Sequence, residues 1–173
     1  GRSLSFADLG TLTDAAEGEL RGIGVRAGDR VLVVAENCPE HAALILAASR
    51  VGAWSCGVNA RMAPGEVDAF AAKADARLLY FTASGSRAAA GHARRHAGVA
   101  SVLPGMQHGA VREQATVEPP PLQDDVAALI FTSGTTGDPK GVMVTHEGLI
   151  HFARISAQSR ALGPRDRSYA FVP

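Results

Sequence analysis

The sequence lacks an excess of charge of either sign and lacks a long apolar run. Its 17 Lys and Arg residues balance 17 Asp and Glu residues, so no overall field would attract it to nucleic acid or an anionic membrane. The longest apolar run, residues 42–48, is far shorter than the about 20 residues that span a bilayer. No basic, apolar leader resembling a secretory signal opens the sequence. We therefore expect neither a nucleic-acid partner nor a transmembrane segment.

Disulfide and metal-binding patterns are absent as well. Cys38 and Cys56 have neither a pairing pattern nor metal-ligand spacing, which predicts two half-buried thiols in a reducing compartment and favours a cytoplasmic location. None of the six histidines forms a two-ligand motif with a nearby cysteine or carboxylate. His92 and His96 lie four residues apart, but two arginines separate them on what we predict to be a solvated helix. The sequence therefore predicts no metal site.

Helical and extended patterns alternate along the chain. The run Val31–Val34 is continuous and rich in β-branched residues, which is typical of a strand buried on both faces. Pro39 and Pro64 each mark the start of a helix. The patterns predict helices near residues 9–20, 39–50, 64–74, 86–97 and 146–160, and strands near 31–34, 54–58, 78–81, 99–103, 126–131, 141–144 and 168–172. Short connections between strands and helices imply right-handed crossovers, so the predicted fold class is α/β, with layered, mainly parallel sheets flanked by helices.

One break divides this alternation. Residues 104–125 are rich in Gly, Pro and Asp and lack periodicity, which indicates an exposed connector. We therefore divide the chain into a first α/β layer over residues 1–103, the connector, and a further segment over residues 126–173. A length of 173 residues suffices for one domain with a substantial core.

The most informative stretch is a loop of glycines, hydroxyl side chains and one lysine that lies between two apolar runs. Its glycines permit positive φ and leave backbone N–H groups uncovered, while its hydroxyls and lysine are further donors for a polyphosphate. No Gly-Lys-Ser/Thr follows, so the loop is not the common P-loop. A flexible hairpin turn is the alternative, although it would require no lysine. We predict that a polyphosphate binds to Thr132, Ser133, Gly134, Thr135, Thr136, Gly137 and Lys140.

Residues 132–141, Thr-Ser-Gly-Thr-Thr-Gly-x-Pro-Lys-Gly, resemble the signature loop of the adenylate-forming (AMP-binding) superfamily. That superfamily includes acyl- and aryl-CoA synthetases, adenylation domains of peptide synthetases, and luciferases. Residues 37–40 (Asn-Cys-Pro-Glu), 64–66 (Pro-Gly-Glu) and 144–146 (Val-Thr-His) are also similar to family segments. The resemblance covers essentially the whole chain and implies a partial N-terminal domain of an adenylate-forming enzyme.

The resemblance implies a two-step activation of a small carboxylic acid. The carboxylate attacks the α-phosphate of ATP to give an acyl-adenylate and pyrophosphate, and coenzyme A then takes the acyl group. The loop would grip the β- and γ-phosphates, with Mg²⁺ held by residues outside this segment. Asn59 is typical of the CoA-synthetase branch, where peptide-synthetase domains usually carry Asp-Pro. We expect no catalytic residue within this segment, and we interpret Trp54 as a core residue and His146 as a helix cap or packing residue.

The resemblance also implies missing parts. The family segments that contact adenine and ribose, the metal-binding glutamate and the small C-terminal domain with its lysine have no counterpart in this sequence. We therefore expect that this polypeptide alone does not catalyse adenylation. An adenylation domain that loads a carrier protein, and a non-catalytic truncated remnant that binds nucleotide phosphates weakly, are the alternatives. The carboxylic acid and the oligomeric state stay open.

Overall fold

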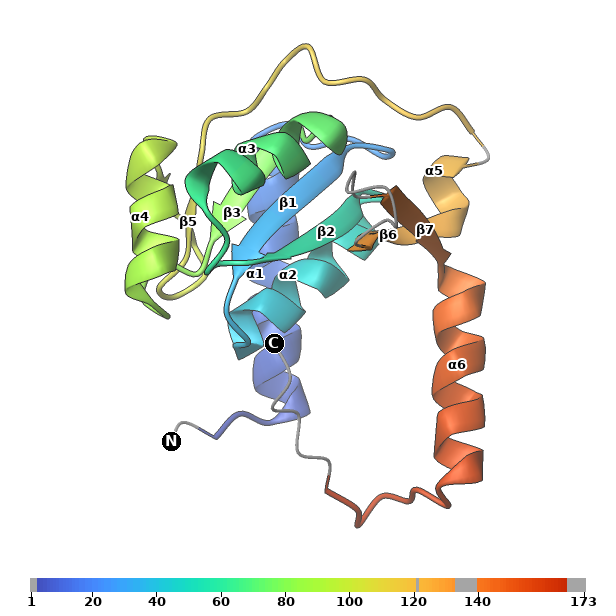
Figure 1. Cartoon of the computed structure of the whole chain (residues 1–173). Helices are drawn as coiled ribbons and strands as arrows, with labels where there is room; N and C mark the ends of the chain where they lie inside the picture. Colours follow the sequence, from blue (N-terminus) through green and yellow to red (C-terminus); the bar gives the residue numbers. More distant parts are fainter. Residues whose placement is uncertain (1–2, 121, 133–139, 168–173) are drawn as a thin grey trace.

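One sheet contains all the strands of the described residues. The computed structural model describes residues 3–120, 122–132 and 140–167. Its strands are β1 (Arg30–Ala35), β2 (Trp54–Asn59), β3 (Leu78–Phe81), β4 (Val99–Ala100), β5 (Gln107–His108), β6 (Val126–Thr132) and β7 (Lys140–Thr145). They lie in the order β4-β5-β3-β1-β2-β6-β7 (Figure 1). The central pairings β3–β1, β1–β2 and β2–β6 are parallel, and the pairings at both edges are antiparallel.

Helices cover both faces of the sheet. They are α1 (Phe6–Gly22), α2 (Pro39–Arg50), α3 (Pro64–Lys73), α4 (Arg87–Arg95), α5 (Leu122–Asp125) and α6 (His146–Ser159). One apolar cluster joins α1 and α2 to Val31, Val33 and Leu78. A second cluster joins α3 and α4 to Leu32 and Val34. Successive residues of β1 thus enter opposite clusters, which explains why its sequence is a continuous apolar run. The predicted α/β class, with a mainly parallel sheet between helices, is confirmed.

Helix starts follow from local chemistry. Pro39 and Pro64 occupy the first turns of α2 and α3, where a missing N–H leaves no helical hydrogen bond unmade. Ser5 caps α1 by accepting a hydrogen bond from the backbone N–H of Asp8, whose carboxylate in turn accepts from the N–H of Ser5. Ser86 caps α4 by accepting from the N–H of Ala89. The predicted starts of α2 and α3 are therefore confirmed.

Two sequence-based expectations were wrong in this part of the chain. The strand predicted over 99–103 is limited to Val99–Ala100, because the chain then turns at Gly105 (φ 75°) and returns as β5. His92 was placed on a solvated helix, yet its side chain is buried, with Nε2 lying 3.1 Å from the carbonyl oxygens of both Ala60 and Met62. The flanking arginines hid this inward-facing position.

The connector contains structure of its own. Residues 104–125 include β5 and α5, and Met106 and Ala115 within them are buried. The segment arches across the sheet from β5 to α5 before β6 begins (Figure 1). β6 then joins the sheet of the first 103 residues through its pairing with β2. The proposed division into layers stays a prediction, and the strand expected at 168–172 lies outside the described residues.

Helix α6 differs from the other long helices because none of its residues is buried. It follows β7 and stands beside the sheet in Figure 1. Its large apolar side chains Leu149, Ile150, Phe152 and Ile155 are exposed, as are Val142 and Met143 on β7. Within the described ranges, no helix combines the length and the apolar character that crossing a membrane requires.

Candidate phosphate-binding hairpin

The predicted phosphate loop connects two antiparallel strands. In the hairpin of β6 and β7, Thr132 pairs with Lys140 and Phe131 pairs with Gly141. Residues 133–139, which carry five of the seven predicted phosphate-binding residues (Ser133, Gly134, Thr135, Thr136 and Gly137), lie outside the described residues. The structure therefore places the two ends of the loop and brings them together.

Thr132 and Lys140 lie opposite each other at the mouth of the hairpin, and both are exposed. The Thr132 hydroxyl donates to the backbone carbonyl of Lys140 over 3.5 Å. Side chains of directly paired residues project from the same face of a two-stranded ribbon. The hydroxyl and the ammonium group of these two residues are thus on one side of the hairpin, where a single anion can contact both.

Aromatic packing holds the end of β6 in place. The ring of Phe131 packs edge-on against Phe70 of α3, with 4.7 Å between ring centroids. Phe131 and Leu129 both contact the apolar cluster below α3. On β7, a Cβ atom at Gly141 would lie 3.0 Å from a methyl group of Leu129, so a glycine leaves room for this side chain. The hairpin is anchored on its α3 side by these contacts.

The helix that follows the hairpin starts at Thr145. Its hydroxyl oxygen accepts a hydrogen bond of 3.0 Å from the N–H of Gly148, which makes Thr145 the N-cap of α6. Of the two roles expected for His146, the helix cap is therefore wrong, because His146 is the first residue of the helix. The packing role stays a prediction for this half-buried residue. In the Val-Thr-His segment, the threonine is the residue that caps the helix.

A cavity of about 430 Å³ lies beside the hairpin. Phe131 and Met143 of the hairpin line it together with Trp54, which is buried as expected for a core residue. No sequence motif includes Arg30, which also lines the cavity and lies 6.0 Å from the centre of the Trp54 ring. Only its position at the start of a strand of β-branched residues marks it as unusual.

Arg30 holds the connector against the base of the sheet. Its guanidinium donates to the carbonyl oxygens of Gly28, Ala74 and Thr116, each over 2.8 Å, and to the carboxylate of Asp75 over 3.2 Å. Because each guanidinium nitrogen donates at least one hydrogen bond, Arg30 is committed to the fold. It fixes residue 116, a short distance before β6, next to the ends of β1 and α3.

Metal ligands do not gather near the hairpin in the part of the chain that the structure describes. Among those residues, no group of three or more His, Cys, Asp or Glu side chains is placed to hold a metal ion. Both cysteines are free thiols; Cys56 is fully buried and Cys38 is half-buried. Burial raises the pKa of the Cys56 thiol from an ordinary 9.0 to about 12, which makes it a poor nucleophile.

Comparison with known families agrees with this geometry. A family model described as "AMP-binding enzyme" matches residues 1–173. The chain belongs to the AMP-binding enzymes. The adenylate-forming resemblance of the loop is thereby confirmed over the full length of the sequence.

Curated relatives of this AMP-binding chain are CoA ligases. It is 34% identical to 4-coumarate–CoA ligase 3 of Oryza sativa subsp. japonica, over 87% of this chain and 28% of the relative. It is 32% identical to a sulfoacetate–CoA ligase of Cupriavidus necator, over 100% of this chain and 35% of the relative. The chain thus spans about a third of the length of the curated relatives that it matches.

A solved structure shares the fold of this AMP-binding chain. The ATP-bound MatB of Rhodopseudomonas palustris aligns with a TM-score of 0.71 and 27% identity, over 96% of this chain and 34% of that chain. The arrangement of strands and helices around the hairpin is therefore one that a nucleotide-bound protein also has.

Proposed function

We propose that this chain is the phosphate-gripping part of an ATP-dependent acid:CoA ligase. The observation that carries the proposal is the hairpin that brings Thr132 and Lys140 together at the ends of a loop of glycines and hydroxyls. Family membership and relatives named as CoA ligases support the same activity. The proposal concerns a protein of the relatives' length, because the chain corresponds to about a third of each.

The proposed reaction has two steps. A carboxylate oxygen of the acid attacks the α-phosphorus of ATP, the bond to the β-phosphate oxygen breaks, and pyrophosphate leaves. The thiol sulfur of coenzyme A then attacks the carbonyl carbon of the acyl-adenylate; AMP leaves and the thiol proton passes to solvent. Negative charge accumulates on the leaving pyrophosphate in the first step, so a donor-rich loop around the β- and γ-phosphates stabilises that step.

Lys140 and Thr132 would have distinct parts in this grip. Lys140 is exposed on a paired strand and forms no ion pair with another described residue, so its ammonium group can reach an anion. Thr132 already has an acceptor in the Lys140 carbonyl, 3.5 Å away, but at this length the hydrogen bond is weak and its hydroxyl can turn to a phosphate. Mg²⁺ would supply further charge neutralisation when bound. The described residues have no cluster that fits it, and we assign no step to it here.

ATP–pyrophosphate exchange tests the activity. The measurement uses a polypeptide of the relatives' length that contains this chain, with a panel of aromatic and aliphatic carboxylic acids. We expect exchange that depends on one class of acid, followed by thioester formation when coenzyme A is added. Exchange without transfer to coenzyme A, but with transfer to a carrier-protein thiol, would overturn the choice of acceptor. No exchange with any acid, while ATP still binds, would favour the non-catalytic alternative.

Substitution of Lys140 tests the site. Hydrogen bonds to a charged group contribute about 1.5–3 kcal/mol, so Lys140→Ala should weaken ATP binding by about tenfold or more. Thr132→Val keeps a β-branched residue in the strand and should weaken binding less. Arg154→Gln on α6 is the control, because it removes one exposed charge away from the hairpin mouth. Equal ATP affinity of the Lys140→Ala and Arg154→Gln proteins would contradict the assignment.

A further inference from the structure

A second cavity lies at the edge of the sheet opposite to the phosphate hairpin. It has a volume of about 410 Å³ and is bounded by α4, by the turn that follows β3, and by the β4–β5 hairpin. The strand order puts β4 and β5 at one edge and β6 and β7 at the other. Cavities that bind small molecules usually measure about 300–1,000 Å³ and combine apolar walls with a few polar groups. This cavity has that size and that kind of lining.

Small side chains create the space. Ala90 of α4 and Ala83 after β3 line the cavity, and the Arg94 guanidinium lies over Gly91, where a Cβ atom would be 3.9 Å from Nη2. Leu103 and Met106, which are buried in the core cluster of α1 and α2, close the cavity on the side of the β4–β5 hairpin. A ring-sized hydrocarbon body would thus contact aliphatic groups on two sides.

Hydrogen bonds fix the rim of the cavity. Both the backbone N–H and the hydroxyl of Ser84 donate to the carbonyl oxygen of Gly105, over 2.9 and 3.0 Å. Gly105 has a φ of 75°, and a Cβ atom there would collide with the Ser84 hydroxyl. The hydroxyl of Ser101 accepts from the N–H of Leu103 and donates to the carboxylate of Glu19. The rim is therefore formed before any ligand arrives, and its serine hydroxyls are already engaged.

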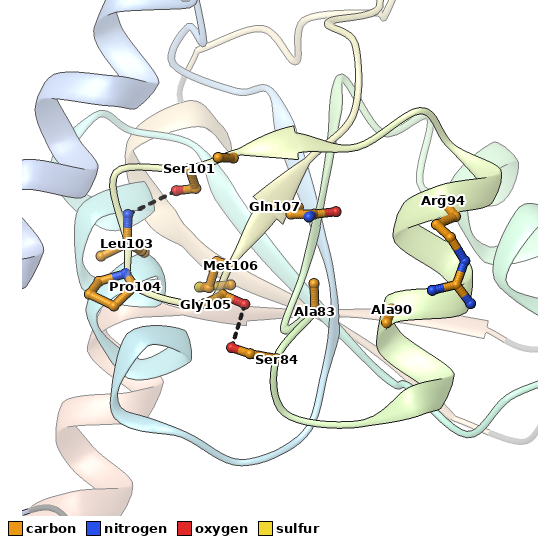
Figure 2. A pocket seen from close by; sticks show the side chains of 11 residues that line it. Ala83, Ser84, Ala90, Arg94, Ser101, Leu103, Pro104, Gly105, Met106 and Gln107 are labelled. Carbon is orange, nitrogen blue, oxygen red and sulfur yellow. Dashed lines mark hydrogen bonds between the residues drawn. The ribbon is translucent and has the colours of Figure 1, made fainter.

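Two polar groups in the cavity remain without a partner. Figure 2 shows Arg94 from α4 and Gln107 from β5 facing the same space, with Ala83 and Ala90 between them. In the described part of the chain, neither the Arg94 guanidinium nor the Gln107 amide has a hydrogen-bond or ion-pair partner. The neighbouring Arg95, by contrast, pairs with Asp68. Arg94 is exposed and lines the open side of the cavity.

The charge of the lining has one sign. Arg94 is the one charged side chain among the described residues that line the cavity. The carboxylate of Glu19 lies behind Ser101 and accepts hydrogen bonds from Tyr80, Ser101 and the N–H of Val102 over 2.6–2.8 Å. Its negative charge is thereby held by three donors. A guanidinium presents two parallel N–H donors that match a carboxylate or a phosphate.

We propose that this cavity binds a small organic anion, with its carboxylate or phosphate on Arg94 and Gln107 and an apolar body of ring size against Ala83, Ala90 and Met106. The site is separate from the phosphate hairpin, and the proposal does not depend on the activity proposed above. It assigns a ligand to a part of the chain that the loop motif leaves unexplained.

A titration followed by amide NMR tests the proposal. The ¹⁵N-labelled 173-residue chain is titrated with benzoate, with phenyl phosphate, and with benzamide as the neutral counterpart. We expect saturable shifts of the amide signals of Ala83, Ala90 and Gln107 with benzoate, phenyl phosphate or both, and weaker binding of benzamide. The anion with the higher affinity then distinguishes carboxylate from phosphate. The absence of saturable shifts at these residues with both anions would overturn the proposal.

Variants of α4 make the test specific. Arg94→Gln should weaken anion binding by about tenfold or more, because it removes a charge-assisted hydrogen bond. Arg87→Gln on the same helix is the matched control, since Arg87 is exposed and does not line the cavity; we expect its affinity to stay within a factor of about two. Unchanged anion affinity in Arg94→Gln, with the amide spectrum otherwise intact, would also overturn the proposal.

Discussion

Replacement of Asp29 should destabilise the fold more than any single exposed ion pair does. Asp29 precedes β1 and is fully buried, and Arg77 precedes β3 with a side chain that is 4% exposed. The Arg77 Nε lies 3.0 Å from the Asp29 Oδ2 atom. Asp29 also accepts hydrogen bonds from the backbone N–H and the guanidinium of Arg26 over 2.7–3.2 Å. Loss of this carboxylate leaves the buried Arg77 charge with only the exposed carboxylate of Glu113, 3.4 Å from Nη2, as a counter-ion.

The expected magnitude follows from that geometry. Breaking a buried pair by removal of one partner destabilises a protein by about 3–5 kcal/mol, because the remaining charge is left uncompensated. Asp29→Asn keeps the size of the side chain but removes its charge, so it isolates the electrostatic part. We expect it to lower the free energy of unfolding by about 2–4 kcal/mol, near the low end of that range, since Arg77 still donates to the carbonyl oxygens of Gly24 and Arg112.

Urea unfolding at neutral pH provides the measurement. The sequence has one tryptophan, Trp54, which is buried, so its fluorescence reports unfolding of the sheet. The dependence of the unfolding free energy on urea concentration shows whether the variant exposes the same amount of surface when it unfolds. Arg50→Gln is the control, because Arg50 forms exposed pairs with Asp14 and Glu17 and should show little change. Equal, small losses in Asp29→Asn and Arg50→Gln would refute the reasoning that burial of the pair makes it important.

Three further perturbations test other parts of the structure. Thr145→Ala should reduce amide protection in α6 by about 1 kcal/mol without affecting β1, because it removes the hydroxyl that caps this unburied helix; Thr145→Ser should restore protection. Iodoacetamide should modify Cys38 before Cys56 in the native chain and both at similar rates in urea. The pKa of Cys56 is raised to about 12 in the folded state, so the thiol of the unfolded chain loses its proton first as pH rises. The free energy of unfolding should therefore fall above pH 9.0. This decrease should be absent in Cys56→Ala. Burial lowers the pKa of His41 from 6.5, so the unfolded chain takes up the proton first as pH decreases. The free energy of unfolding measured in urea should therefore fall below pH 6.5. It should fall less steeply in His41→Gln.

Local patterns account for much of the fold. The apolar run at Val31–Val34 predicts a strand buried on both faces, and it is buried on both faces because its residues alternate between two apolar clusters. Pro39 and Pro64 predict helix starts because a fixed φ and a missing N–H suit the first turn of a helix and few other positions. Such patterns are formed by residues that are adjacent in the chain, so they can be recognised in a single sequence.

The errors have a common physical cause. A strand over 99–103 and a solvated His92 were inferred from neighbours in the sequence, whereas pairing with β5 and burial against Ala60 are decided by residues distant in the chain. The same holds for Arg30, whose partners include Ala74 and Thr116. No local periodicity marks such contacts.

The sequence by itself determined the family and the hydrogen-bond donors that the loop carries. The glycines, hydroxyls and lysine of residues 132–141 specify a donor-rich loop whatever the surrounding fold, because those properties belong to the residues themselves. The tertiary structure decided which polar groups are available to bind a ligand. It pairs Thr132 with Lys140 at the hairpin mouth and commits Arg30 and Arg77 to internal partners. It leaves Arg94 beside a cavity with no partner among the described residues. The physical reason is that availability depends on burial and on partners, and both arise only when distant segments pack together.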